Sequence, residues 1–177
     1  HYSEHTEGEG REILEAACDA EMEGIIGKKA DSLYAGNRNG DWIKVKCEKR
    51  QEFVIGGFTS SDKRNKGISA LLLGVYEQGD LLYAGRTGTG FSQRQRKELE
   101  GEFKSILRKT PPFKDAPKER SGEEIFWVTP KLIAEVRFQE WTDDDLLRQA
   151  SFKGLREDKN PEDVKREKTA SSAEGGI

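Results

Sequence analysis

The sequence predicts a mainly β protein whose largest part is a small barrel with one inserted helix. From residue 50 onward, apolar and polar side chains alternate in short runs separated by turn-forming residues, as in β-strands. After the third run, residues 92–109 instead repeat their apolar side chains at three- and four-residue steps, which is typical of a helix. Three strands, a helix and two strands is the order of elements in a five-stranded OB barrel.

Turn-forming residues set the limits of these elements. The five strands are expected at residues 52–59, 68–76, 81–87, 125–128 and 132–141. Ser92 is expected to be the N-cap of the helix, and Pro111 stops it because proline cannot donate a helical hydrogen bond. Further along the chain, Leu146 and Leu147 indicate a short helix.

The first 48 residues are expected to form a separate piece. Residues 9–23 have helical spacing, and residues 24–27 and 42–47 have the pattern of short strands. A helix and two strands make a poor core, so we expect this piece to be poorly ordered, to pair with the barrel or to pair with a second copy in a homodimer. The expected domains are residues 1–48, the barrel at 49–160 and a disordered tail at 161–177.

Composition limits the classes of protein that fit. Hydrophobic residues make up 33% and charged residues 36%, with a net charge of −3. No apolar run is long enough to cross a bilayer, so we expect a cytoplasmic protein with no membrane partner. The chain opens on His1 without Met or a leader, which indicates a fragment or a processed piece. Cys18 and Cys47 form no C-x-x-C motif, and we expect two reduced thiols.

Several charged residues have a pattern that suits phosphate chemistry. Lys44 and Lys46 share one face of a strand, where two ammonium groups suit a polyphosphate, although lysines also keep edge strands soluble. Glu23 stands between a helix and a strand, where it is either a ligand of a phosphate-bridging metal or a surface charge. Residues 86–120 hold ten Lys and Arg against five Asp and Glu, which fits nucleic-acid backbone binding or a solvated helix.

Three short motifs resemble those of the covalent nucleotidyltransferases. Residues 23–28 (EGIIGK) resemble motif IV, residues 42–46 (WIKVK) resemble motif V, and residues 155–159 (LREDK) resemble motif VI. Two motifs before a barrel and one at its end is the order found in ATP-dependent DNA ligases. Further stretches are similar to the ligase domain of the bacterial DNA ligase D family, the end-joining ligases: residues 51–57, 83–91 and 151–156.

The sequence departs from this family at its nucleophile. Covalent nucleotidyltransferases attack the α-phosphate of ATP with the lysine of a Lys-x-Asp-Gly motif, and this sequence has no such motif. Residues 29–32 (KADS) lie between motifs IV and V and end in serine instead of glycine. Motif III is also absent. The resemblance therefore implies that the nucleophile lies upstream of His1 and that this chain alone does not adenylylate itself.

The resemblance implies cofactors, partners and residue roles. The cofactors are ATP and Mg²⁺ (or Mn²⁺), and the partners are nicked or broken duplex DNA and polymerase or nuclease domains in the same polypeptide. The implied ATP contacts are Glu23, which also touches the metal, with Lys44 and Lys46 on the α-phosphate. The implied catalytic residues, which close over the β- and γ-phosphates, are Arg156, Asp158 and Lys159. The residues expected on or near the DNA face are Lys49, Arg50, Lys63, Arg64, Lys66 and Arg86.

Two other functions share part of this pattern. The barrel is also compatible with a stand-alone OB-fold module that binds nucleic acid through backbone contacts. Motifs IV to VI also occur in RNA ligases and capping-type nucleotidyltransferases. The stretches at residues 51–57 and 83–88 favour the end-joining DNA ligases, so the sequence predicts the C-terminal part of an ATP-dependent DNA ligase.

Overall fold

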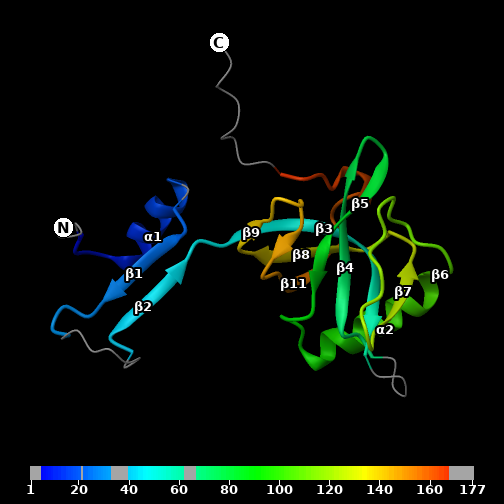
Figure 1. Ribbon diagram of the computed structural model, residues 1–177, viewed down its shortest axis with the longest axis horizontal. Coiled ribbons are helices and arrows are strands. Elements are labelled where there is room, and N and C mark those ends of the chain that lie inside the picture. Colours follow the sequence, from blue (N-terminus) through cyan, green and yellow to red (C-terminus); the bar gives the residue numbers. More distant parts are fainter. Residues whose placement is uncertain (1–4, 21, 33–39, 62–66, 168–177) are drawn as a thin grey trace, which may run out of the picture. The chain divides into compact units, whose positions relative to one another are not determined.

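The computed structural model describes residues 5–20, 22–32, 40–61 and 67–167 (Figure 1). The chain divides into two compact units, His1–Glu48 and Lys49–Ile177. Within the described ranges, no helix has the length and apolar character needed to cross a membrane.

The smaller unit consists of a helix and a β-hairpin. Helix α1 spans Gly10–Asp19, and strands β1 (Gly24–Lys28) and β2 (Trp42–Lys46) pair in antiparallel fashion. The helix is shorter than the predicted residues 9–23, so Glu23 lies outside it at the start of the hairpin. Among the described residues of this unit, the large hydrophobic side chains that lie exposed are Met22, Ile26, Trp42 and Ile43.

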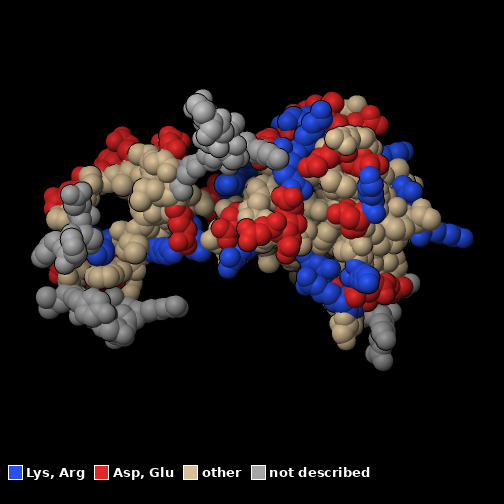
Figure 2. Space-filling view, turned by 45° about the horizontal axis from the view of Figure 1, so that its top comes forward, with Lys and Arg blue, Asp and Glu red and all other residues tan. Residues whose placement is uncertain are grey.

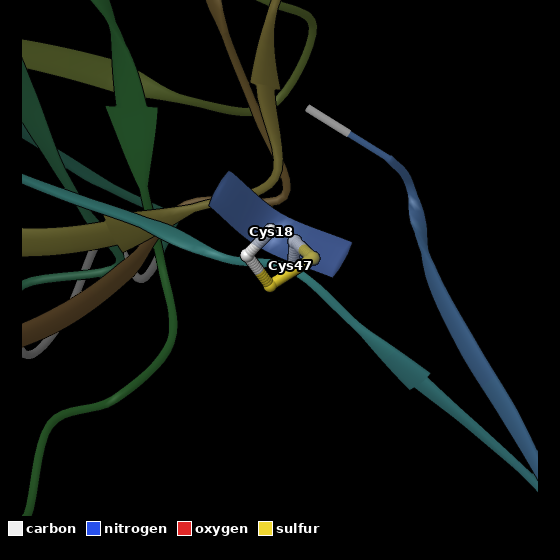
Figure 3. The surroundings of a disulfide bond; sticks show 2 residues. All are labelled: Cys18 and Cys47. Atoms are coloured by element: carbon white, nitrogen blue, oxygen red, sulfur yellow. A yellow bond between two sulfur atoms is a disulfide. The ribbon is translucent and has the colours of Figure 1, made fainter. Parts of the chain in front are cut away.

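A disulfide bond joins the helix of this unit to the end of its hairpin (Figure 3). Cys18, near the end of α1, bonds to Cys47, which directly follows β2. The prediction of two reduced thiols is therefore wrong. The prediction relied on an expected reducing cytoplasm and on the absence of a C-x-x-C motif. In the structure, the hairpin returns the chain to α1, so two cysteines that are 29 positions apart in sequence have a Cα–Cα distance of 5.4 Å.

The larger unit is built on one curved antiparallel sheet. Its main strands are β3 (Lys49–Ser60), β4 (Ala70–Glu77), β5 (Asp80–Thr87), β7 (Glu124–Val128), β8 (Ile133–Phe138) and β11 (Ser151–Arg156). The short strand β6 (Leu107–Arg108) pairs with β7 in this sheet, whereas β9 (Glu140–Trp141) and β10 (Leu147–Arg148) pair with each other in a separate two-stranded sheet. The main path runs β11-β8-β3-β4-β5, with β7 added beside β3.

Strand β3 organises this sheet because it has three partners. Its first half, Lys49–Val54, pairs with β8, and Gly57–Ser60 pairs with β7 along the same edge. Its other edge pairs with β4. The two ends of the path are tied together where the Phe152 N–H donates to the Thr89 carbonyl at 2.9 Å and the Thr87 hydroxyl donates to the Ala150 carbonyl at 2.9 Å.

Helix α2 (Gln93–Ile106) crosses one end of the strands (Figure 1). The predicted N-cap is confirmed, because the Ser92 hydroxyl accepts the Gln95 N–H and the Gln95 side chain accepts the Ser92 N–H. Leu99 and Phe103 project from α2 into the core. The helix ends before Pro111 because Leu107 begins a strand that pairs with β7.

Three segments differ from their prediction. Residues 151–156, which were not assigned to a strand, form β11, and Leu147 belongs to strand β10 instead of a short helix. Residues 161–167, predicted to be part of a disordered tail, form a short 3-10 helix (Pro161–Asp163) and then pack against the barrel. Val164 is buried there, and its carbonyl accepts the Tyr76 N–H at 2.8 Å.

Candidate functional site

The hairpin of the smaller unit brings Glu23, Lys44 and Lys46 together. Because β1 and β2 pair in register, Gly24 lies opposite Lys46, and Glu23 stands one residue before that pair. The Lys44 ammonium donates to Glu23 Oε1 at 2.8 Å, and the Lys46 Nζ atom lies 3.7 Å from the same oxygen. These three predicted residues therefore form one exposed cluster of two cations around one carboxylate.

The charges of this cluster stabilise one another. The hydrogen bond from Lys44, followed by its charge and that of Lys46, holds the pKa of the Glu23 carboxyl below its ordinary value. Among the residues that the structure describes, no group of three or more His, Cys, Asp and Glu could hold a metal ion.

A second cluster lies at the end of β11, on the barrel. Arg156 donates to Asp158 twice, from Nε to Oδ1 at 2.9 Å and from a terminal nitrogen to Oδ2 at 2.8 Å. Lys159 follows and donates to a carboxylate of β3, Glu52. The structure thus brings the predicted Arg156, Asp158 and Lys159 together in one network.

Two further carboxylates belong to this network, and the sequence interpretation missed both. Glu52 on β3 and Glu135 on β8 lie directly opposite each other, with side chains only 15% and 26% exposed. The Nη1 atom of Arg156 lies 3.6 Å from Glu52 and 3.8 Å from Glu135. An open pocket beside this network is lined by Arg50, Gln51, Glu52, Glu135, Lys159 and Glu167.

The residues predicted for the DNA face fall into three groups. Lys49 and Arg50 are exposed at the start of β3, although Arg50 also lies 3.4 Å from Glu135. Arg86 is mostly buried and donates to Glu123 at 2.8 Å. Lys63, Arg64 and Lys66 lie outside the described residues. A DNA contact stays a prediction for all six residues.

The larger unit has no uniform basic surface on the face shown in Figure 2, because its basic side chains lie among acidic ones. Figure 2 shows acidic and basic side chains intermixed over the face of the larger unit that it displays. Any phosphate contact by this barrel therefore depends on particular side chains more than on the field of the whole unit.

The pair formed by Asp158 and Arg156 is expected to persist in strong acid. Hydrogen bonding to Arg156 lowers the pKa of Asp158 to about 2. Because the folded-state pKa is below the ordinary value, the pair's contribution is complete above that ordinary value and is lost as the pH falls through about 2.

An NMR titration of the Asp158 carboxyl carbon checks this expectation. The midpoint should lie near pH 2 in the wild type and return toward about 3.9, the usual aspartate value, in Arg156→Ala. A wild-type midpoint that matches the variant would show that the pair does not form in solution.

The chain is similar to the C-terminal regions of known DNA ligases. Residues 64–159 match the family described as "ATP dependent DNA ligase C terminal region". The chain is 39% identical over 163 residues to the multifunctional non-homologous end joining protein LigD of Pseudomonas aeruginosa, covering 90% of this chain and 19% of that protein. It is also 39% identical over 162 residues to the end-joining DNA repair protein LigD of Mycobacterium tuberculosis, covering 90% of this chain and 21% of that protein.

Solved structures show the same similarity. The crystal structure of the ligase domain from M. tuberculosis LigD matches with a TM-score of 0.60 and 39% identity, over 91% of this chain and 52% of that chain. A mycobacterial DNA ligase D complexed with ATP and MES matches with a TM-score of 0.59 over the same shares of the two chains. This chain thus spans about a fifth of the length of the curated relatives and about half of the solved ligase domain.

These similarities show that the barrel is an OB domain of the kind that DNA ligases carry, which confirms the predicted fold. The family match covers more than half of the 177 residues, and the chain belongs to the family of C-terminal regions of ATP-dependent DNA ligases. The resemblance to the end-joining ligases is confirmed by the LigD relatives.

Proposed function

We propose that this chain is the C-terminal part of an ATP-dependent DNA ligase that seals DNA breaks in non-homologous end joining or related repair in the bacterial cytoplasm, close to the nucleoid. The observation that carries the proposal is that two charged clusters each present two cations, Lys44 with Lys46 and Arg156 with Lys159, in a chain whose relatives are end-joining ligases. In this proposal, a lysine outside this chain attacks the α-phosphate of ATP and pyrophosphate leaves. The AMP then passes to the 5′-phosphate of the break, and the adjacent 3′-hydroxyl displaces it.

The hairpin is proposed to hold the α-phosphate. Lys44 and Lys46 offer two ammonium groups that at present share the single carboxylate of Glu23. A nucleotide phosphate carries more negative charge than one carboxylate and can take up both cations. Glu23 is then available to the ribose or to a metal ion. A bound Mg²⁺ (or Mn²⁺) would neutralise phosphate charge as the leaving group departs.

The cluster at the end of β11 is proposed to act on the leaving pyrophosphate. Arg156 and Lys159 are cations that a triphosphate attracts, and Asp158 fixes one edge of the guanidinium through two hydrogen bonds. Fixed donors aimed at developing negative charge accelerate a reaction more than mobile ones do. In this proposal, the OB domain moves during the reaction cycle so that this cluster closes over the β- and γ-phosphates of ATP.

The barrel is also proposed to bind the duplex around the break. Lys49 and Arg50 are exposed on β3 and can contact the DNA backbone, and the sequence pattern adds Lys63, Arg64 and Lys66 to the proposed contacts. Arg86 is the weakest of these candidates because Glu123 already neutralises it. Polymerase and nuclease domains in the same polypeptide are further proposed partners, since the LigD relatives are multifunctional and much longer than this chain.

Labelled ATP and Mg²⁺ test this proposal. The chain alone should take up no label, because its sequence lacks the Lys-x-Asp-Gly nucleophile. The polypeptide that joins it to the segment carrying that motif should become labelled and seal nicked duplex DNA. Lys44→Ala in that polypeptide is expected to slow labelling on the order of 10²-fold, because it removes one preorganised phosphate contact.

Lys29→Ala is the matched control, since Lys29 is an exposed lysine just beyond β1. It should label and seal at the wild-type rate. Label on the isolated chain would refute the missing-nucleophile argument. A joined polypeptide that takes up label but leaves nicked DNA unsealed would refute the ligase function.

A further inference from the structure

We propose that Glu52 is a positioning residue that orients both cations at the end of β11, Arg156 and Lys159, for the nucleotide phosphates. The inference rests on the proposed function and names a residue outside the nucleotidyltransferase motifs. Glu52 is the carboxylate that these two cations share: Lys159 donates to one of its oxygens, and Arg156 lies 3.6 Å from the other.

The sheet itself places this carboxylate. Glu52 on β3 pairs in register with Glu135 on β8, and β8 in turn pairs with β11, which ends at Arg156. Two carboxylates directly opposite each other on neighbouring strands repel and destabilise a sheet unless cations lie between them. Here the Arg156 side chain lies close to both carboxylates, so the acidic pair attracts this guanidinium and fixes its position.

Burial indicates that Glu52 is the fixed member of the network. Its side chain is 15% exposed, against 37% for Arg156, 45% for Lys159 and 60% for Asp158. Asp158 holds the Nε edge of Arg156 from the solvent side, while Glu52 and Glu135 face Nη1 from the sheet. Long cationic side chains lose much rotamer freedom when they bind phosphate. Restraint from two sides removes part of that loss before the nucleotide arrives.

The Lys159 contact has the same consequence. Hydrogen bonding to Glu52 raises the pKa of Lys159 above its ordinary value, because the contact favours the charged form of the lysine. Lys159 lies three residues beyond the end of β11, and the contact with a rigid central strand fixes where this cation points.

A comparison of two reaction steps tests this inference in the polypeptide that carries the nucleophile. Glu52→Gln keeps the shape of the side chain and removes its charge, and it should slow self-adenylylation by up to about 10²-fold, the effect of a misplaced catalytic contact. Sealing of nicked DNA that already carries AMP should proceed at the wild-type rate, because that step involves no triphosphate. Glu52→Asp should recover part of the lost rate.

A double-variant cycle shows whether Glu52 acts through its two partners. In a background of Arg156→Ala with Lys159→Ala, Glu52→Gln should have no further effect on adenylylation. Glu124→Gln is the control, because it removes an exposed carboxylate from strand β7. Equal slowing of both steps by Glu52→Gln, or unchanged or faster adenylylation, would overturn the proposal.

A measurement on the chain itself separates this inference from the ligase function. In Glu52→Gln, the NMR signals of the Arg156 Nε–H and the Lys159 ammonium should shift, and their relaxation should show more mobile side chains. Both signals should stay unchanged in Glu124→Gln. Unchanged signals in Glu52→Gln would overturn the positioning role. If the polypeptide takes up no label while these signals respond as expected, the ligase proposal fails and the orienting role of Glu52 is supported.

Discussion

Replacing Phe53 by alanine is expected to lower the free energy of unfolding of the barrel by about 3–5 kcal/mol. Phe53 is fully buried on β3. The centroid of its ring lies 5.9 Å from that of Phe138 and 5.8 Å from that of Trp141. The substitution removes apolar surface that folding takes out of water, and it leaves a cavity that the close-packed neighbours fill only in part.

Denaturant unfolding followed by circular dichroism and tryptophan fluorescence measures this loss. Leu107→Ala is the control, because Leu107 is 51% exposed and its truncation leaves no cavity. The control should change the unfolding free energy by less than about 1 kcal/mol. A similarly small effect of Phe53→Ala, with an unchanged denaturant dependence, would contradict the central place of Phe53 in the core.

Breaking the bond between Cys18 and Cys47 is expected to destabilise the smaller unit by about 3.5 kcal/mol. The estimate follows from the entropy that a cross-link over 29 positions removes from the unfolded chain. This unit has little else to stabilise it, since Ala17 is the single hydrophobic residue that is buried among its described residues. Loss of the bond should therefore loosen the hairpin that carries Lys44 and Lys46.

Hydrogen exchange of the intact chain, measured before and after reduction of the disulfide, tests this effect. In a second experiment, the double variant Cys18→Ser with Cys47→Ser removes the bond without a reductant. Mass spectrometry first confirms the bond, because the oxidised chain is two hydrogens lighter. The amides of β1 and β2 should exchange much faster without the disulfide, while those of β4 in the barrel should not change. Equal protection of β1 and β2 in both states would show that the bond adds no stability.

Much of the barrel was predictable because its strands have local signals. The turn at residues 77–80 illustrates this: Gln78 and Gly79 both have positive φ angles, the conformation that a two-residue hairpin loop requires and that glycine adopts without strain. Ser92 likewise has the sequence of an N-cap, with Gln95 three residues later.

The missed elements break the local pattern on which prediction depends. The pairing of β11 with β8 shifts register between Phe152 and Gly154, so the strand does not alternate apolar and polar residues in the usual way. Strand β10 follows Asp145, whose φ of 61° breaks the helical conformation that Leu146 and Leu147 suggested.

The candidate site was predictable only where a motif is local. Glu23, Lys44 and Lys46 belong to two short motifs, and the hairpin register then places them together. Glu52 and Glu135 had no such signal, because their contact depends on which residue of β3 lies opposite which residue of β8. The disulfide was missed for the same reason, since spacing along the chain does not give proximity in space.

The three partners of β3 also constrain the order in which the barrel can fold. When a ribosome has synthesised the chain only through α2, β3 has β4 on one edge, while β7 and β8, the partners of its other edge, do not yet exist. That open edge can pair with other chains until the later strands emerge. Arg50 on β3 pairs with Arg137 on β8, and most of the barrel sequence lies between these two residues. Folding must therefore close a long loop of chain, and we expect folding of the barrel to take milliseconds to seconds.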